Sequence, residues 1–350
     1  MSNKKQRESN IELLRILSML IIVIYHFLIH SIIPNSPELN YITKPLITVL
    51  HIGVICFVLI SGYWGIKFSL KSFTKIFFYC SFYSILIYIF GVLLNPELFS
   101  IKNSIKSLIP IQWWFIPVYL CLFLLTPIIN TQLKTANKST KIFTIILLII
   151  ISFGFGQFVP SLSGGKNPIN FILIYYLGNY LRTELNTDKL NIKKIIFLYL
   201  GCNIILFSII FLAEILFPAA NKIINPLFFP YNSIGLIINS ILFFLIFTKL
   251  TFSSKLVNWL ASSSLAVYLI HENKYIGHYL HNYVNYLQNH IDNGILFSLS
   301  IILFGILIFI LAVSIDKLIS PLFQLIINQI TSLKIFMKIN NKVQRILEEK

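Results

Sequence analysis

Ten apolar stretches, most of them about as long as a membrane-spanning helix, constrain this chain of 350 residues more than any other feature. They lie at residues 11–31, 45–64, 76–94, 113–130, 142–159, 169–181, 195–217, 232–250, 256–276 and 295–315. Hydrophobic residues make up 57% of the chain and charged residues only 11%, which is more apolar surface than a soluble fold can bury. Because the stretches do not alternate as barrel strands do, the sequence predicts an all-α polytopic membrane protein with about ten transmembrane helices.

The lysines and arginines between these stretches predict the orientation of the chain. If the N-terminus lies in the cytoplasm, 21 of the 28 lysines and arginines fall on the cytoplasmic side and six on the outer side. Positive residues accumulate in cytoplasmic loops, so the pattern predicts that both termini are cytoplasmic. The formal net charge of +16 has the same explanation, and we expect membrane lipid as a partner but no nucleic acid.

The apolar stretches end near residue 317 and suggest two parts. We expect residues 1–317 to form the membrane domain and residues 318–350 to form a cytoplasmic amphipathic tail, which carries several lysines and an arginine. The four cysteines lie inside apolar stretches without paired spacing, so neither a metal site nor a tightly bound cofactor is expected from them. The chain contains no glycine-rich phosphate loop, nucleophile elbow or metal-binding His/Glu pair on a helix.

Arg15 and His26 are the most informative residues of the first stretch. Eleven residues separate them, so in a helix they lie on one face, about 16 Å apart along the axis. Ionisable groups are costly inside a membrane, which favours a functional stripe facing the protein interior. Glu12 can pair with Arg15 from one turn away, and the alternative is that this pair only compensates charge near the cytoplasmic end. A histidine at this depth is suited to act as a general base, although a packed, hydrogen-bonded role is the simpler interpretation.

The ninth stretch brings a second candidate histidine. Ser264, Tyr268 and His271 share one helical face, and His271 lies toward the outer end of the stretch, as His26 does in the first. Two histidines at similar depth on different helices predict one polar cavity, with Glu272 at its outer mouth. The alternative is a polar cluster at a helix end.

Further candidates lie in the second and fourth stretches. Ser61 is followed by Gly62, and such small residues commonly allow close helix packing. Trp113 and Trp114 open the fourth stretch. A tryptophan pair at this position is typical of an aromatic belt at the membrane interface, while the functional alternative is a surface on which a sugar stacks.

Four segments, in this order, resemble motifs of the acyltransferase 3 family of integral membrane O-acyltransferases. They are NIELLRILSMLIIVIYH with its arginine and histidine, GVICFVLISGY, QWWFIPVYLCLFLLTPIIN and SLAVYLIH. The resemblance extends from the first stretch to the ninth. Two features depart from the family pattern: Ile55 stands where many members have aspartate, and Lys67, Lys71 and Lys75 stand in the loop where many have an arginine pair.

The resemblance implies a membrane acyltransferase domain over residues 1–317, located in the bacterial plasma membrane. It implies transfer of an acyl group, most simply acetyl, from acetyl-CoA or another acyl-CoA to a hydroxyl of an exopolysaccharide, capsule or lipid-linked glycan. We expect Arg15 to hold a phosphate of the donor. We expect His26 to act as base or to take the acyl group itself, and His271 to position the acceptor or share the proton, with Ser264 and Tyr268 orienting His271.

Two other classes of membrane protein fit part of the pattern. A transporter or flippase could use the same polar stripe to conduct protons or to pass a lipid-linked glycan, and a polysaccharide polymerase also has many helices. Transporters often show an internal repeat and polymerases a large external loop, and neither feature is visible in the sequence.

Overall fold

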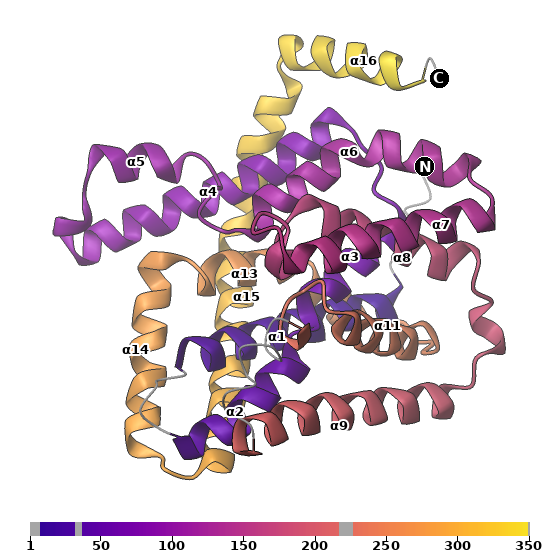
Figure 1. The fold of residues 1–350 in the computed structure, drawn as a ribbon. Coiled ribbons are helices and arrows are strands. Elements are labelled where there is room, and N and C mark those ends of the chain that lie inside the picture. Colours follow the sequence, from indigo (N-terminus) through magenta and orange to yellow (C-terminus); the bar gives the residue numbers. More distant parts are fainter. Residues whose placement is uncertain (1–7, 32–36, 217–226, 349–350) are drawn as a thin grey trace.

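The computed structural model describes residues 8–31, 37–216 and 227–348, and these residues contain helices and no β-strand. Helix makes up 84% of the structure, which confirms the predicted all-α class. In chain order the helices are α1 (Ser9–Ser31), α2 (Pro37–Leu50), α3 (Gly53–Trp64), α4 (Leu70–Leu94), α5 (Ile101–Ser107), α6 (Phe115–Thr135), α7 (Lys138–Ile149), α8 (Pro168–Thr183), α9 (Ile192–Leu216), α11 (Ile234–Thr248), α12 (Lys255–Ala261), α13 (Ser264–His271), α14 (Lys274–His290), α15 (Gly294–Ser332) and α16 (Lys334–Glu348) (Figure 1).

Seven helical segments within the described residues are long and apolar enough to cross a membrane. They are Ser9–His30, Thr43–Trp64, Leu70–Leu94, Phe115–Thr135, Lys138–Gln157, Ile192–Ala213 and Gly294–Ser332. Each corresponds to one of the ten predicted stretches. The remaining three stretches form shorter helices, namely α8 with 16 residues, α11 with 15, and α12 with α13. The chain is therefore a multi-pass helical membrane protein, while the count of ten spans and the location of the termini stay predictions.

The predicted ninth span, residues 256–276, is divided into short helices. Ser262 donates its hydroxyl hydrogen bond to the Trp259 carbonyl, and the Ser263 hydroxyl donates to Asp316 of α15. Serine side chains that bond locally or to another helix compete with the regular helix. Asn273 then caps the start of α14 by accepting from the backbone N–H of Tyr275. The polar residues of this stretch therefore break it before and after α13.

Helix α1 occupies the middle of the structure and contacts α2, α3 and α11 to α15 (Figure 1). Gly53, at the start of α3, lies so close to α1 that a Cβ atom there would come within 2.7 Å of the Ser18 carbonyl oxygen. The other end of α3 packs equally closely on α8, where a Cβ on Gly62 would lie 2.8 Å from Tyr175 Cα. These glycines bring α1, α3 and α8 into backbone contact, as is common for small residues between membrane helices.

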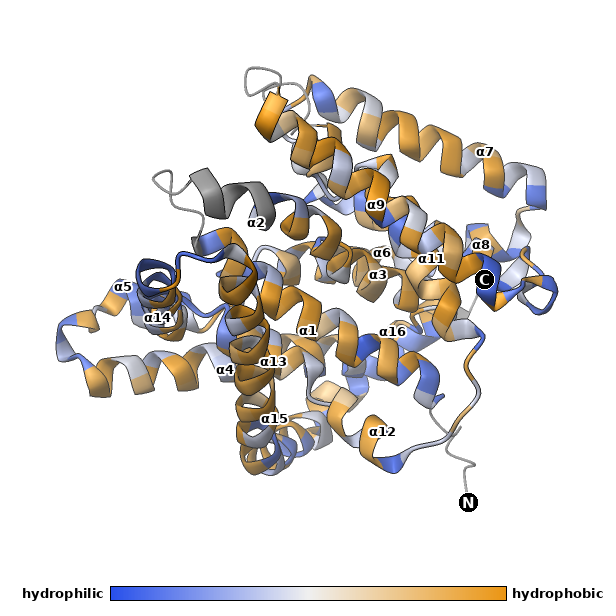
Figure 2. Ribbon diagram, turned by 90° about the horizontal axis from the view of Figure 1, so that it is seen from below, coloured by the Kyte–Doolittle hydropathy of each residue, from blue (hydrophilic) through white to orange (hydrophobic). Residues whose placement is uncertain are grey.

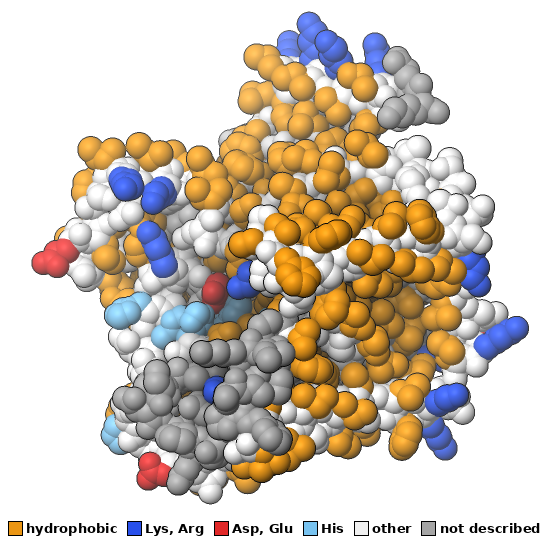
Figure 3. Space-filling model, in the orientation of Figure 1, with side chains coloured by type: hydrophobic (Ala, Val, Ile, Leu, Met, Phe, Trp, Pro, Cys, Tyr) orange, Lys and Arg blue, Asp and Glu red, His pale blue; other side chains and the backbone are white. Residues whose placement is uncertain are grey.

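The outer helices expose large apolar side chains. Phe143 of α7, Phe197 of α9 and Leu303 of α15 have 62%, 75% and 68% of their surface exposed. Figure 2 shows that α7, α9 and α15 are dominated by hydrophobic residues, and Figure 3 shows an extended apolar surface on one face of the molecule. A soluble protein rarely exposes apolar patches of this extent, so these surfaces suit contact with lipid.

Segments that the charge pattern places on the cytoplasmic side contact one another. The Ser9 hydroxyl donates to Oδ1 of Asn258 over 3.1 Å, which joins the start of α1 to α12. The guanidinium of Arg182, at the end of α8, donates to the Tyr63 carbonyl at the end of α3 over 3.0 Å. Both contacts are consistent with one common side for these helix ends.

The C-terminal part begins within a continuous helix. Helix α15 runs through residue 317 to Ser332, and α16 projects beyond the rest of the molecule (Figure 1). Lysines and an arginine recur along α16, while Ile335 and Ile339 are exposed. This amphipathic composition agrees with the character predicted for residues 318–350, whose separation as a tail stays a prediction.

Candidate active site

Two buried histidines from distant parts of the chain meet between α1 and α13. Nδ1 of His26 lies 2.9 Å from Nε2 of His271, and their ring centroids are 5.2 Å apart. His26 is 6% exposed and His271 is fully buried. The structure thus brings together the two residues that the sequence identifies as candidate catalytic groups.

The hydrogen bonds of this pair define which ring nitrogens carry protons. Nδ1 of His271 lies 2.6 Å from the Val267 carbonyl oxygen, which can only accept, so Nδ1 carries the proton. In the neutral ring, Nε2 of His271 then accepts a hydrogen bond from Nδ1–H of His26. The lone pair of a neutral His26 therefore lies on Nε2, which makes Nε2 the nitrogen that can receive a proton from a substrate.

Glu272 adds a carboxylate to the histidine pair. Its Oε2 lies 3.0 Å from Nδ1 of His26, and its Oε1 lies 3.9 Å from Nε2 of His30. His30 also stacks against His281 of α14 at 4.3 Å between ring centroids. Burial and the neighbouring His30 lower the pKa of His281 to about 4, so its ring is neutral at neutral pH. The carboxylate is placed to stabilise a positive charge on His26.

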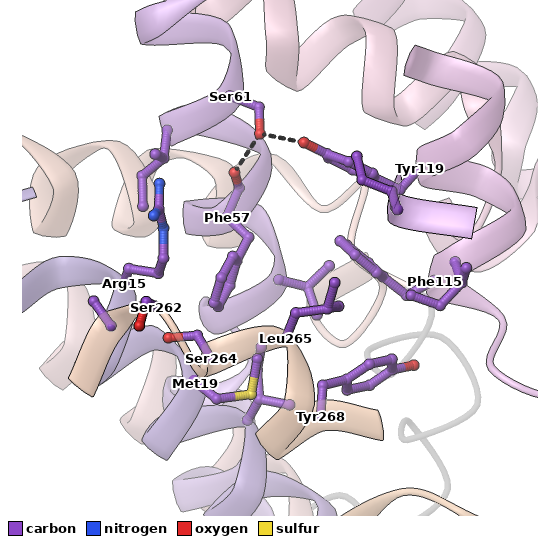
Figure 4. Close-up of a pocket in the computed structure, with 16 residues that line it drawn as sticks. Arg15, Met19, Phe57, Ser61, Phe115, Tyr119, Ser262, Ser264, Leu265 and Tyr268 are labelled. Carbon is purple, nitrogen blue, oxygen red and sulfur yellow. Dashed lines mark hydrogen bonds between the residues drawn. The ribbon is translucent and has the colours of Figure 1, made fainter. Parts of the chain in front are cut away.

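A cavity of about 270 Å³ lies beside α1 and is lined by Arg15, Met19 and Ile22 (Figure 4). These three residues and His26 follow one another at helical spacing, so they share one face of α1. The Arg15 guanidinium pairs with the Glu12 carboxylate at 3.0 Å, and 30% of its side chain is exposed. Arg15 therefore has contact with both solvent and the cavity.

Tyr268 separates the cavity from the histidine pair. It lines the cavity together with Ser264, whereas neither His26 nor His271 does. The Tyr268 ring centroid is 6.3 Å from that of His26 and 6.0 Å from that of His271. Neither Ser264 nor Tyr268 makes the hydrogen bond that orients His271, because the Val267 carbonyl makes it. The cavity thus ends at the ring of Tyr268, one residue away from the histidines.

A second cavity continues from the first toward the start of α1. It has a volume of about 450 Å³, and both cavities are lined by Arg15, Ser61 and Tyr119. Ser61 donates to the Phe57 carbonyl and lies 3.1 Å from the Tyr119 hydroxyl, so the shared wall is polar (Figure 4). Together the two cavities connect the start of α1, near Glu8, with Tyr268.

The two tryptophans of the predicted pair have different surroundings. Trp113 is only 1% exposed and lies in the core before α6. Trp114 packs against Tyr231 with ring centroids 5.2 Å apart, and the Lys166 ammonium group lies 5.2 Å from its ring centroid. Trp113 thus contributes to packing, whereas Trp114 contacts a charged residue, Lys166.

The sequence did not indicate the role of Asp316. This carboxylate is 2% exposed and accepts hydrogen bonds from the hydroxyls of Tyr79, Tyr83 and Ser263 at 2.6–2.7 Å. It connects α4 and the start of α13 to α15. A single acidic residue at the end of an apolar stretch is weak evidence for a buried hydrogen-bond acceptor, because such residues are equally common where a loop begins.

The fold and the site define a class: a polytopic helical membrane protein with a buried histidine pair next to an arginine-bearing cavity. The family comparison makes this more specific. A family model described as an acyltransferase domain, that of acyltransferase 3, matches residues 8–317, and the chain belongs to this family. The family supports acyl transfer as the activity. No curated protein and no solved structure matches the chain significantly.

Proposed function

We propose that this protein transfers an acetyl group from acetyl-CoA to a hydroxyl of a cell-surface or exopolysaccharide sugar at the bacterial plasma membrane. The observation that carries the proposal is the 2.9 Å contact between Nδ1 of His26 and Nε2 of His271. This contact leaves Nε2 of His26 as a base. General bases of this kind accelerate reactions by about 10²–10⁴-fold.

The cavities beside α1 suit an elongated donor. When a coenzyme A phosphate binds, the Arg15 guanidinium would exchange its charge-assisted contact with Glu12 for one with the phosphate. The distance along α1 from Arg15 to His26, about 16 Å, is comparable to an extended pantetheine arm. The apolar wall formed by Met19 and Ile22 accommodates that arm. Tyr268 is displaced when the thioester passes from the cavity to the histidines.

The acceptor reaches His26 from the opposite direction. The His30 side chain is 42% exposed, and the Glu272 carboxylate lies between His30 and His26. Figure 3 shows histidine side chains at the molecular surface. A sugar hydroxyl arriving here reaches the His26 ring past the Glu272 carboxylate, without crossing the donor cavity.

The reaction needs a base for the hydroxyl proton and a group that stabilises the positive charge which the base acquires. Nε2 of His26 takes the hydroxyl proton while the hydroxyl oxygen attacks the thioester carbonyl carbon. The carbon–oxygen ester bond forms, the carbon–sulfur bond breaks, and the thiolate receives the proton from His26. Glu272 stabilises the transient imidazolium, since Oε2 lies 3.0 Å from Nδ1.

Two measurements test the proposed function. Acetyl-CoA should raise the melting temperature of the purified protein, and membranes containing it should move a radiolabelled acetyl group from acetyl-CoA to the host glycan. Loss of the gene should remove O-acetyl signals from the glycan NMR spectrum. A protein that is unaffected by acetyl-CoA and leaves these signals unchanged would instead fit the transporter, flippase or polymerase class.

A further inference from the structure

We propose that His26, His271 and Glu272 also form a binding site for a divalent transition metal, best matched by Zn²⁺, and that the metal switches off the base. The inhibitory half of this proposal rests on the proposed function. The binding half depends only on the geometry of three side chains.

The three donor atoms are already close to a coordination shell. Nδ1 of His26 lies 2.9 Å from Nε2 of His271 and 3.0 Å from Oε2 of Glu272, and one donor atom from each residue lies within 4.8 Å of the others. Zinc binds imidazole nitrogen and carboxylate oxygen at about 2.0–2.2 Å, which separates tetrahedral ligands by roughly 3.4 Å. The two pairs that involve Nδ1 of His26 need to move apart by a few tenths of an ångström, and the His271 and Glu272 donor atoms already lie within 4.8 Å of each other.

The surroundings of His271 favour metal binding. Its Nδ1–H donates to the Val267 carbonyl at 2.6 Å, so the lone pair of Nε2 points to His26. Metal-binding histidines almost always donate their second ring N–H in this way, which fixes the tautomer and the ring orientation. His271 is fully buried and His26 nearly so, and Oε2 of Glu272 makes no hydrogen bond of good geometry among the described residues.

The His30 side of the site is the more exposed one. The His30 side chain is 42% exposed, and its Nε2 lies 3.9 Å from Oε1 of Glu272. A zinc ion with two nitrogen ligands and one oxygen ligand needs a fourth, which water or His30 supplies. The ion would therefore enter from the side on which the acceptor approaches.

Occupancy would remove the base without removing the residue. Zinc on Nδ1 of His26 requires that nitrogen to give up its proton. A neutral ring then carries its proton on Nε2, and this nitrogen can no longer accept one from a sugar hydroxyl. Acyl transfer would stop, and a chelator would restore it.

Direct binding tests the site. Purified full-length protein, freed of metal with EDTA, should bind one Zn²⁺ in a competition titration with a zinc-sensitive dye. We expect Glu272→Gln and His271→Ala each to weaken this binding at least about tenfold. A control with His278→Ala and His290→Ala, both exposed on α14, should bind as the wild type does. Binding lost in this control but retained in the Glu272 and His271 variants would overturn the proposal.

A second measurement needs no variant. The X-ray absorption fine structure at the zinc edge of the wild-type complex should show a four-coordinate zinc bound by imidazole nitrogen and carboxylate oxygen. A shell of six oxygen ligands would contradict the site. Inhibition is measured separately, as acetyl transfer with and without Zn²⁺. If the protein binds Zn²⁺ but transfers no acetyl group, the proposed function alone is refuted. If the protein transfers acetyl but neither binds Zn²⁺ nor is inhibited by it, this inference alone is refuted.

Discussion

The Ser263 hydroxyl donates a 2.6 Å hydrogen bond to Oδ2 of Asp316, which fixes the start of α13 to α15. The other carboxylate oxygen accepts from Tyr79 and Tyr83 of α4. Because α13 carries Ser264, Tyr268 and His271, this buried carboxylate positions the helix that supplies half of the histidine pair.

Replacing Asp316 should therefore destabilise the protein. In Asp316→Ala the hydroxyls of Tyr79, Tyr83 and Ser263 lose their acceptor, and we expect the free energy of unfolding to fall by about 2–4 kcal/mol. Unfolding in a denaturing detergent series measures this change. The control is Asp292→Ala, which removes an exposed carboxylate and should leave the unfolding midpoint unchanged. Equal midpoints for the two variants would show that the hydrogen bonds to Asp316 contribute nothing.

Gly62→Ala should be one of the most damaging small substitutions in the chain. Its new Cβ would lie 2.8 Å from Tyr175 Cα, so α3 and α8 must separate. Overpacking of this kind costs about 1–3 kcal/mol or more. Gly201→Ala is the matched control, because no atom of the described residues lies within 4 Å of the Cβ it would add. Thermal unfolding should show a lower melting temperature for Gly62→Ala only, and a wild-type melting temperature for it would mean that the helices are not in backbone contact.

The ion pair between Lys141 and Glu184 predicts how stability depends on pH. Lys141 Nζ lies 2.5 Å from Oε1 of Glu184, and this hydrogen bond lowers the pKa of Glu184 below its usual 4.5. A carboxylate with a lowered folded-state pKa stabilises the fold above its unfolded-state pKa and loses that effect as the pH falls. The melting temperature should therefore decline below about pH 4.5, and Glu184→Gln should flatten the decline.

The same experiment contains its own control. Glu97 is exposed near the short helix α5, and Glu97→Gln should leave the pH dependence of the melting temperature as it is in the wild type. If the Glu184→Gln curve parallels the wild-type curve, the ion pair does not contribute to stability at low pH.

Arg15 should act on the donor. We expect Arg15→Ala to raise KM for acetyl-CoA by about 10–100-fold, the equivalent of one lost charge-assisted hydrogen bond, and to change kcat much less. Steady-state kinetics at varied acetyl-CoA and fixed acceptor measure both constants. Arg345→Ala, an exposed arginine of α16, is the control. A larger effect of Arg15→Ala on the acceptor KM than on the donor KM would assign Arg15 to the acceptor.

Local sequence patterns predicted the helices and much of the histidine site. Hydropathy and helical spacing depend on neighbouring residues, so they sufficed to place Arg15 and His26 on one face of α1. They did not predict that Glu272 would approach Nδ1 of His26, that Trp113 would lie in the core, or that Asp316 would anchor α13. Each of these depends on contacts between residues more than 12 positions apart, which spacing along one helix does not contain. The break in the predicted ninth span has the same cause, since the Ser263 hydroxyl at this break donates its hydrogen bond to Asp316 of another helix.

The role of His26 as the base is tested most directly by the acetyl-transfer rate of His26→Ala. The protein should be purified beside His278→Ala, which removes an exposed histidine of α14. Saturating acetyl-CoA and acceptor should give a kcat about 10²–10⁴-fold below wild type for His26→Ala and a wild-type kcat for His278→Ala. A folded His26→Ala protein that transfers acetyl at the wild-type rate would contradict the assignment.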